Sequence, residues 1–79
     1  NEQSKLESVL VLISEEDWNY AHALFNTIFP DYLDACGKYD YYRAALRLAD
    51  NIPDFAISRE RATERMDILL KTCNRPAEE

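Results

Sequence analysis

The scarcity of turn residues is the feature that most constrains how this chain can fold. Its 79 residues include one glycine, Gly37, and three prolines. All-β domains use many turn residues, and phosphate-binding loops need several glycines close together. The sequence therefore excludes a dinucleotide fingerprint and a P-loop, and it favours an all-α domain.

The length allows one domain with a single small core. A chain of 79 residues is about half of a typical domain, and it buries only about 60% of its unfolded surface. Hydrophobic residues make up 47% and charged residues 30%, which is typical of globular proteins. We expect residues 1–76 to form the domain and residues 77–79 to be a frayed tail. A large enzyme with its own cofactor domain is excluded.

The N-terminal region shows neither a secretory nor a membrane pattern. No apolar run approaches the roughly 20 residues that cross a bilayer, and a charged start followed by an apolar segment is missing. The sequence begins at Asn1 rather than at a methionine, so we expect a processed product or an excised domain that does not associate with membranes.

Apolar periodicity predicts a compact bundle of five short helices, with six helices as the alternative. Hydrophobic residues recur at spacings of three and four, which places them on one face of each helix. The expected helices cover residues 6–13, 18–29, 30–37, 41–52 and 58–73. We expect the core to contain Trp18, Phe25, Phe29, Leu48, Met66 and Leu69.

Helix boundaries are predicted from capping residues. Ser14, Asp40 and Ser58 are expected N-caps, because their side chains can accept a hydrogen bond from the first turn. Pro30 removes a backbone donor, so the second helix should stop or kink there. Gly37 can adopt a left-handed conformation, so it should end the third helix.

Two isolated cysteines, Cys36 and Cys73, lack the close spacing of a zinc site, and the chain has one histidine. We expect both to be small buried hydrophobic residues in a reducing compartment, and hence a cytoplasmic protein without metal or cofactor. A disulfide joining two helix ends is the alternative that the sequence leaves open.

The net charge of −6 is unevenly distributed along the chain. Residues 1–42 contain two Lys/Arg and eight Asp/Glu, residues 43–75 contain seven Lys/Arg and five Asp/Glu, and the last four residues contain two Glu. An acidic half beside a mildly basic half suits contact with another protein or with a second copy. The alternative is that these charges serve solubility alone.

The best candidates for partner binding lie at charged helix positions. In the 58–73 helix and just after it, Arg61, Arg65, Ile68 and Arg75 are predicted to share the face opposite the core. Arginines around an exposed apolar residue are typical of interfaces, although single exposed apolar residues are also common. The acidic candidates for a head-to-tail contact are Glu15, Glu16 and Asp17, with Asp31 and Asp34 nearby in sequence. Helix capping is the competing explanation for these acids.

We expect no catalytic activity. His22 is the only histidine, and it borders the apolar face of the 18–29 helix, so we interpret it as a packing residue. No serine, cysteine or acid lies at an obvious spacing to form a nucleophile and base with it. Asp31 and Asp34 are interpreted as solvated acids because no pocket is expected to raise either pKa.

Nucleic-acid binding is the main alternative function. Seven basic residues could form one surface on the last two predicted helices: Arg43, Arg47, Arg59, Arg61, Arg65, Lys71 and Arg75. That arrangement is loosely similar to a helix-turn-helix. The acids Glu60, Glu64 and Asp67 and the negative net charge argue against it. An acidic inhibitor that mimics DNA is a further alternative.

Several apolar and capping positions follow the pattern of a known family. They are Ser14-Glu15-Glu16-Asp17, Ala23-Leu24-Phe25, Phe29-Pro30-Asp31, a short helix ending at Gly37, and Ile57-Ser58 before a last helix with Ala62 and Met66. Over residues 14–73 the chain resembles the prokaryotic effector-associated domains of the death-like superfamily. It departs from them in having Met66 where tryptophan is frequent, and in five expected helices rather than six.

The resemblance implies a compact helical adaptor of bacterial defence or signalling, of the kind fused to proteases, TIR-type proteins or NTPases. It also implies homotypic pairing through opposed charged faces, which agrees with the charge asymmetry. We therefore expect a non-catalytic protein–protein interaction module.

Overall fold

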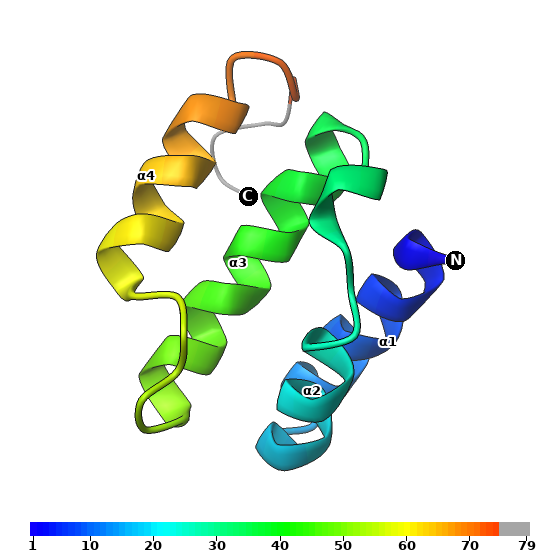
Figure 1. The fold of residues 1–79 in the computed structure, drawn as a ribbon, viewed down its shortest axis with the longest axis vertical. Helices are drawn as coiled ribbons and strands as arrows, with labels where there is room; N and C mark the ends of the chain where they lie inside the picture. Colours follow the sequence, from blue (N-terminus) through cyan, green and yellow to red (C-terminus); the bar gives the residue numbers. More distant parts are fainter. Residues whose placement is uncertain (75–79) are drawn as a thin grey trace.

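The computed structural model describes residues 1–74 and is all-α, as expected. Four α-helices and one 3-10 turn follow each other along the chain: α1 (Glu2–Ser14), α2 (Trp18–Phe25), η1 (Pro30–Tyr32), α3 (Ala35–Asn51) and α4 (Arg59–Leu69) (Figure 1). Five helices were expected, so the prediction was wrong in number. None of the helices in the described part of the chain is long and apolar enough to cross a membrane. The expected tail, residues 77–79, lies outside the described residues.

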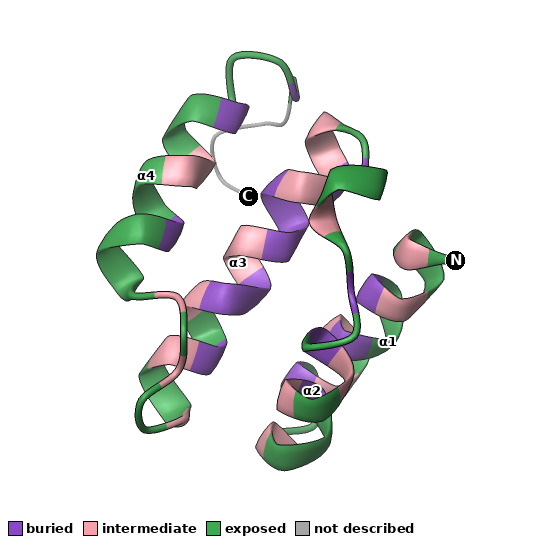
Figure 2. Ribbon diagram, in the orientation of Figure 1, coloured by how far each residue is buried: buried purple, intermediate pink, exposed green. Residues whose placement is uncertain are grey.

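Helix α3 is the centre of the molecule. Helix α4 packs along one side of α3, and α1, α2 and η1 pack against the other side (Figure 1). The buried residues line the inner sides of these helices (Figure 2). The fully buried side chains of the core are Leu6 and Val9 of α1, Ala21 of α2, Ala45 and Leu48 of α3, and Ala62 of α4.

The core differs from the predicted one in three positions. Phe25, Leu48 and Leu69 are buried, as predicted. Trp18 and Met66 are only half-buried, and Phe29 is 64% exposed. Helix α2 ends at Phe25 rather than at Phe29, and the backbone then turns, so Ile28 enters the core instead.

Polar side chains cap the starts of α1 and α4. The Ser4 N–H donates to Asn1 Oδ1 (2.8 Å) at the start of α1. Ser58 accepts from the Arg61 N–H (3.1 Å), which confirms its predicted role at the start of α4. The prediction for Ser14 was wrong, because its hydroxyl donates back to the Val11 carbonyl (2.6 Å) and makes no cap for α2.

The predicted break at Gly37 and Asp40 does not exist. Asp34 caps α3 by accepting from the Gly37 N–H (2.7 Å), so the helix starts before the glycine and runs through it. A Cβ at Gly37 would lie 3.0 Å from Gln3 Oε1 and 3.1 Å from Leu33 Cβ. Glycine therefore serves a close approach between α3 and its neighbours, and Asp40 is a buried residue inside α3 rather than a cap.

The two cysteines form a disulfide, so the expectation of reduced thiols was wrong. Cys36 lies in the first turn of α3, and the fully buried Cys73 follows α4; their Cα atoms are 4.9 Å apart. The bond fastens the end of α4 to the start of α3. Disulfides persist in oxidising environments. The cysteines therefore do not support the expected cytoplasmic location, which stays a prediction.

Candidate functional site

A row of rings crosses from α2 to α3 and is the most distinctive surface feature of the fold. We call His22, Phe55, Phe25, Tyr41 and Tyr42 the aromatic row. Neighbouring ring centroids lie 5.4 Å (His22–Phe55), 5.5 Å (Phe55–Phe25), 4.4 Å (Phe25–Tyr41) and 5.1 Å (Tyr41–Tyr42) apart. Phe25 and Tyr41 are buried, and the other three are half-buried. The row joins elements distant in sequence, and three of its five rings are partly exposed.

His22 has a packing role in this row. Its ring meets Phe55 in an edge arrangement, and the two residues come from α2 and from the connection between α3 and α4. The side chain is half-buried, which agrees with the interpretation from the sequence.

Arg65 lies against the aromatic row, and its predicted position was wrong. Its Cζ is 5.8 Å from the centre of the Tyr42 ring, so the side chain packs towards α3 rather than away from the core. Its Nε is buried without a hydrogen-bond partner among residues 1–74. The sequence reasoning missed this contact because Tyr42 lies on another helix.

Arg61 and Ile68 lie on the exposed part of α4, as predicted. Ile68 is 47% exposed, and Arg61 is also exposed. Burial raises the pKa of Tyr41, with a smaller contribution from Tyr42, and the Arg61 charge opposes this rise. We call Arg61 and Arg65 the arginine edge. Arg75, the fourth residue predicted for this surface, lies outside the described residues.

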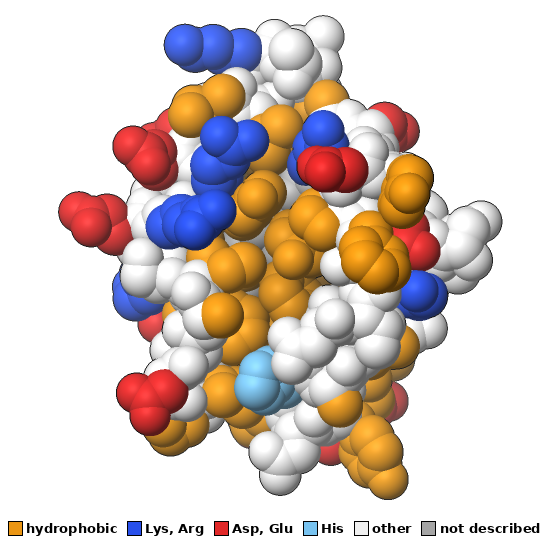
Figure 3. Space-filling view, in the orientation of Figure 1, with side chains coloured by type: hydrophobic (Ala, Val, Ile, Leu, Met, Phe, Trp, Pro, Cys, Tyr) orange, Lys and Arg blue, Asp and Glu red, His pale blue; other side chains and the backbone are white. Residues whose placement is uncertain are grey.

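Figure 3 shows the face that contains these features. Lys and Arg side chains gather over α4, and hydrophobic side chains fill the area between α4 and the segment that contains η1. The single histidine marks the lower part of this area, which agrees with its place in the aromatic row.

The predicted acidic residues are not brought next to the arginine edge. Glu15 and Glu16 are exposed in the turn between α1 and α2, with Glu16 in a left-handed conformation (φ 59°). That turn lies across α3 from α4 (Figure 1). Neither Glu15 nor Glu16 makes a salt bridge within the described part of the chain. Asp34 caps α3. Helix capping, the competing explanation for this acid, therefore accounts for its position.

A second exposed site surrounds η1 and was missed in the sequence. Phe29 is 64% and Tyr32 78% exposed, and their ring centroids are 6.2 Å apart. With the exposed Asp31 between them, these residues form what we call the η1 edge. Pro30 is the sequence signal that could have predicted their exposure, because it starts η1 after α2 has ended.

The η1 edge is fastened to α1. The Phe29 N–H donates to Glu2 Oε2 (2.6 Å), and Lys5 Nζ donates to the Thr27 carbonyl (3.1 Å). The bond from Phe29 lowers the pKa of Glu2, and Lys5, 3.3 Å away, lowers it further. These contacts hold the exposed rings on a defined backbone.

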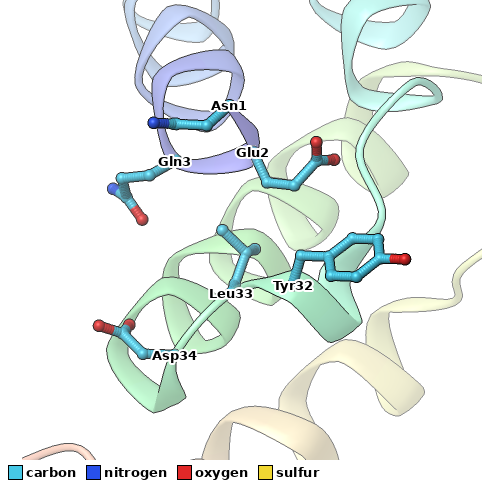
Figure 4. Close-up of a pocket in the computed structure, with 6 residues that line it drawn as sticks. All are labelled: Asn1, Glu2, Gln3, Tyr32, Leu33 and Asp34. Atoms are coloured by element: carbon cyan, nitrogen blue, oxygen red, sulfur yellow. The ribbon is translucent and has the colours of Figure 1, made fainter.

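An open hollow of about 620 Å³ lies beside the η1 edge (Figure 4). Its lining comes from the first turn of α1 and from η1 and the residues after it: Asn1, Glu2, Gln3, Tyr32, Leu33 and Asp34. The hollow is a surface depression with acidic and aromatic walls. Residues 1–74 contain no group of three His, Cys, Asp or Glu side chains that could hold a metal ion.

The geometry defines a small α-helical domain with charged and aromatic surface edges. Comparisons with known proteins give no further identification: no family model matches the chain, and no curated protein or solved structure matches it either.

Proposed function

We propose that this domain is a non-catalytic adaptor that binds another protein, and that the partner is a second copy. The observation that carries the proposal is the arginine edge beside the aromatic row. Within the described residues, Arg61 and Arg65 lack a carboxylate partner, and the half-buried Tyr42 ring lies beside Arg65. Arginine beside aromatic surface is enriched at protein interfaces.

The salt bridges of the described residues leave this edge available. They join Glu2 to Lys5, Asp40 to Arg43, and Asp50 to Arg59. A carboxylate from a partner would therefore meet Arg61 without displacing an existing ion pair. Charge complementarity of this kind mainly increases association rate and specificity.

A second copy fits because the same chain also carries acids without partners. Exposed Glu15 and Glu16 lie on the other side of α3, and the net charge is −6. The likeness to effector-associated domains, a role in bacterial defence signalling and a cytoplasmic location belong to the same proposal.

Nucleic acid is less well supported as a partner. Arg43 and Arg59 are paired with aspartates, and Arg47 lies over the Trp18 ring, 5.6 Å from its centre. Three of the basic side chains that would have to contact phosphates are therefore engaged within the domain.

The test is self-association measured by light scattering over a wide concentration range, at low and high salt. We expect association that weakens as salt screens the charges. Arg61→Glu combined with Ile68→Asp should weaken it tenfold or more. Lys71→Glu is the control for the charge reversal at Arg61, because Lys71 is exposed beyond α4 and each of these two substitutions lowers the net charge by two. Arg65 is left intact because it packs on Tyr42.

Two results would contradict the proposal in different ways. A monomer at every concentration and salt would exclude a second copy as the partner. Self-association that Arg61→Glu with Ile68→Asp leaves unchanged would place the interface on another surface.

A further inference from the structure

We infer that two copies form a closed twofold dimer in which the arginine edge of each contacts the η1 edge of the other. This inference rests on the proposed function and names the surface that the second copy brings. In this dimer the arginine edge contacts the η1 edge of the second copy. The acidic turn at Glu15 and Glu16 is therefore not the contact surface.

The chemistry of the two edges is complementary. A guanidinium forms strong hydrogen bonds with a carboxylate, and it also stacks on aromatic rings. The η1 edge offers both, because exposed Asp31 lies between two exposed rings, Phe29 and Tyr32. The turn at Glu15 and Glu16 offers carboxylates, but Trp18 beside it is half-buried and already has Arg47 over its ring.

The arrangement of the edges suits twofold symmetry. Both border the face shown in Figure 3, with the arginine edge over α4 and η1 on the other side of the hydrophobic area. A rotation of 180° about an axis that runs parallel to this face, between the two copies, places the two faces against each other and brings each edge opposite its complement. The aromatic rows would then lie against each other, and the interface would be isologous and closed.

The inferred dimer sets a requirement on the area of the interface. A stable interface buries about 800 Å² on each partner, which is roughly a sixth of the 5123 Å² surface of this chain. The η1 edge also loses little freedom on binding, since Glu2 and Lys5 already hold its backbone on α1. Preordered groups bind with a smaller entropic cost.

The first experiment is sedimentation equilibrium on the full chain and on single variants. We expect a species of twice 9.2 kDa that does not grow further as concentration rises. Tyr32→Ala should raise the dissociation constant tenfold or more. Tyr20→Ala is the matched control, because Tyr20 is 70% exposed and lies two residues from His22, on the other side of α2. It should change the constant less than twofold.

A mixing experiment identifies the paired edges directly. Arg61→Glu and Asp31→Lys should each weaken the dimer, because each variant pairs like charges in both contacts of its homodimer. A mixture of the two should restore the dimer, since one contact then pairs Glu with Lys and the other keeps the native Arg and Asp. Arg61 and Asp31 are both exposed, so folding of the variants is checked simply by circular dichroism.

The outcomes separate this inference from the proposed function. Self-association that is lost with Glu15→Lys and Glu16→Lys but insensitive to Tyr32→Ala would overturn the inference and retain a homotypic adaptor. Growth into larger oligomers would overturn the closed geometry in the same way. A monomer under all conditions would overturn both.

Discussion

Cys36 and Cys73 are 37 positions apart in sequence, yet their Cα atoms lie 4.9 Å from each other. Their disulfide joins the start of α3 to the segment that follows α4. Helix α4 buries Ala62 and Leu69 and packs mainly on α3. A covalent bond therefore supports a helix with a small hydrophobic contribution of its own.

Reduction of this disulfide should destabilise the domain strongly. Closing a loop of this length removes conformational entropy from the unfolded chain, and the expected loss on reduction is about 4 kcal/mol. Urea denaturation with and without reductant measures it. The double variant Cys36→Ser/Cys73→Ser should match the reduced protein and show no response to reductant. Equal stabilities of the oxidised and reduced protein would contradict the structural role of the bond.

Leu48 should matter more to stability than Trp18. Leu48 is fully buried in the last turn of α3, so Leu48→Ala should cost about 3 kcal/mol through lost burial and a cavity. Trp18 is half-buried with Arg47 over its ring, so Trp18→Ala should cost about 2 kcal/mol. Urea denaturation followed by circular dichroism ranks the two variants. Tryptophan fluorescence is unsuitable because Trp18 is the only tryptophan, and the Trp18→Ala variant lacks it. A larger loss for Trp18→Ala would place the tryptophan in the core.

Glu2 should make stability depend on acid pH. Its pKa is lowered from 4.5 in the folded chain, first by the hydrogen bond from Phe29. The ionised carboxylate therefore stabilises the fold above the unfolded pKa, and this stabilisation is lost as the pH falls through the lower folded value. Glu2→Gln should be less stable than the native chain at neutral pH, and the difference should shrink in acid. Glu7→Gln, on the same helix, is the control and should show no such convergence.

Tyr41 should ionise at a higher pH in the folded protein than in the unfolded chain. Burial raises its pKa above 10.0, so the fold disfavours the phenolate. The fold keeps its full stability while the pH is below the pKa that Tyr41 has in the unfolded chain. The stability falls as the pH rises from that value through the higher pKa of the folded state. Absorbance of the phenolate across an alkaline titration should show a late component that Tyr41→Phe removes. The control Tyr20→Phe, which removes an exposed phenol, should leave that late component in place.

Local signals in the sequence were sufficient for the fold class and for part of the core. One glycine in 79 residues and apolar residues at helical spacing predicted an all-α domain, because periodicity reports which side of a helix meets the core. Ser58 was predicted as a cap for the same reason: the hydrogen bond that it accepts spans three residues. Such contacts are visible within one turn of sequence.

Tertiary packing decided which of several equally apolar or equally polar side chains are buried and which are exposed. Phe29 continued the apolar pattern of α2, yet an early helix end and the hydrogen bond that its N–H donates to Glu2, 27 residues away, placed it at the surface. Arg65 continued a charged pattern, but Tyr42 of α3 draws it inward. In both cases the sequence determined the helical pattern, whereas a contact with another element, which periodicity does not contain, determined the exposure of the side chain.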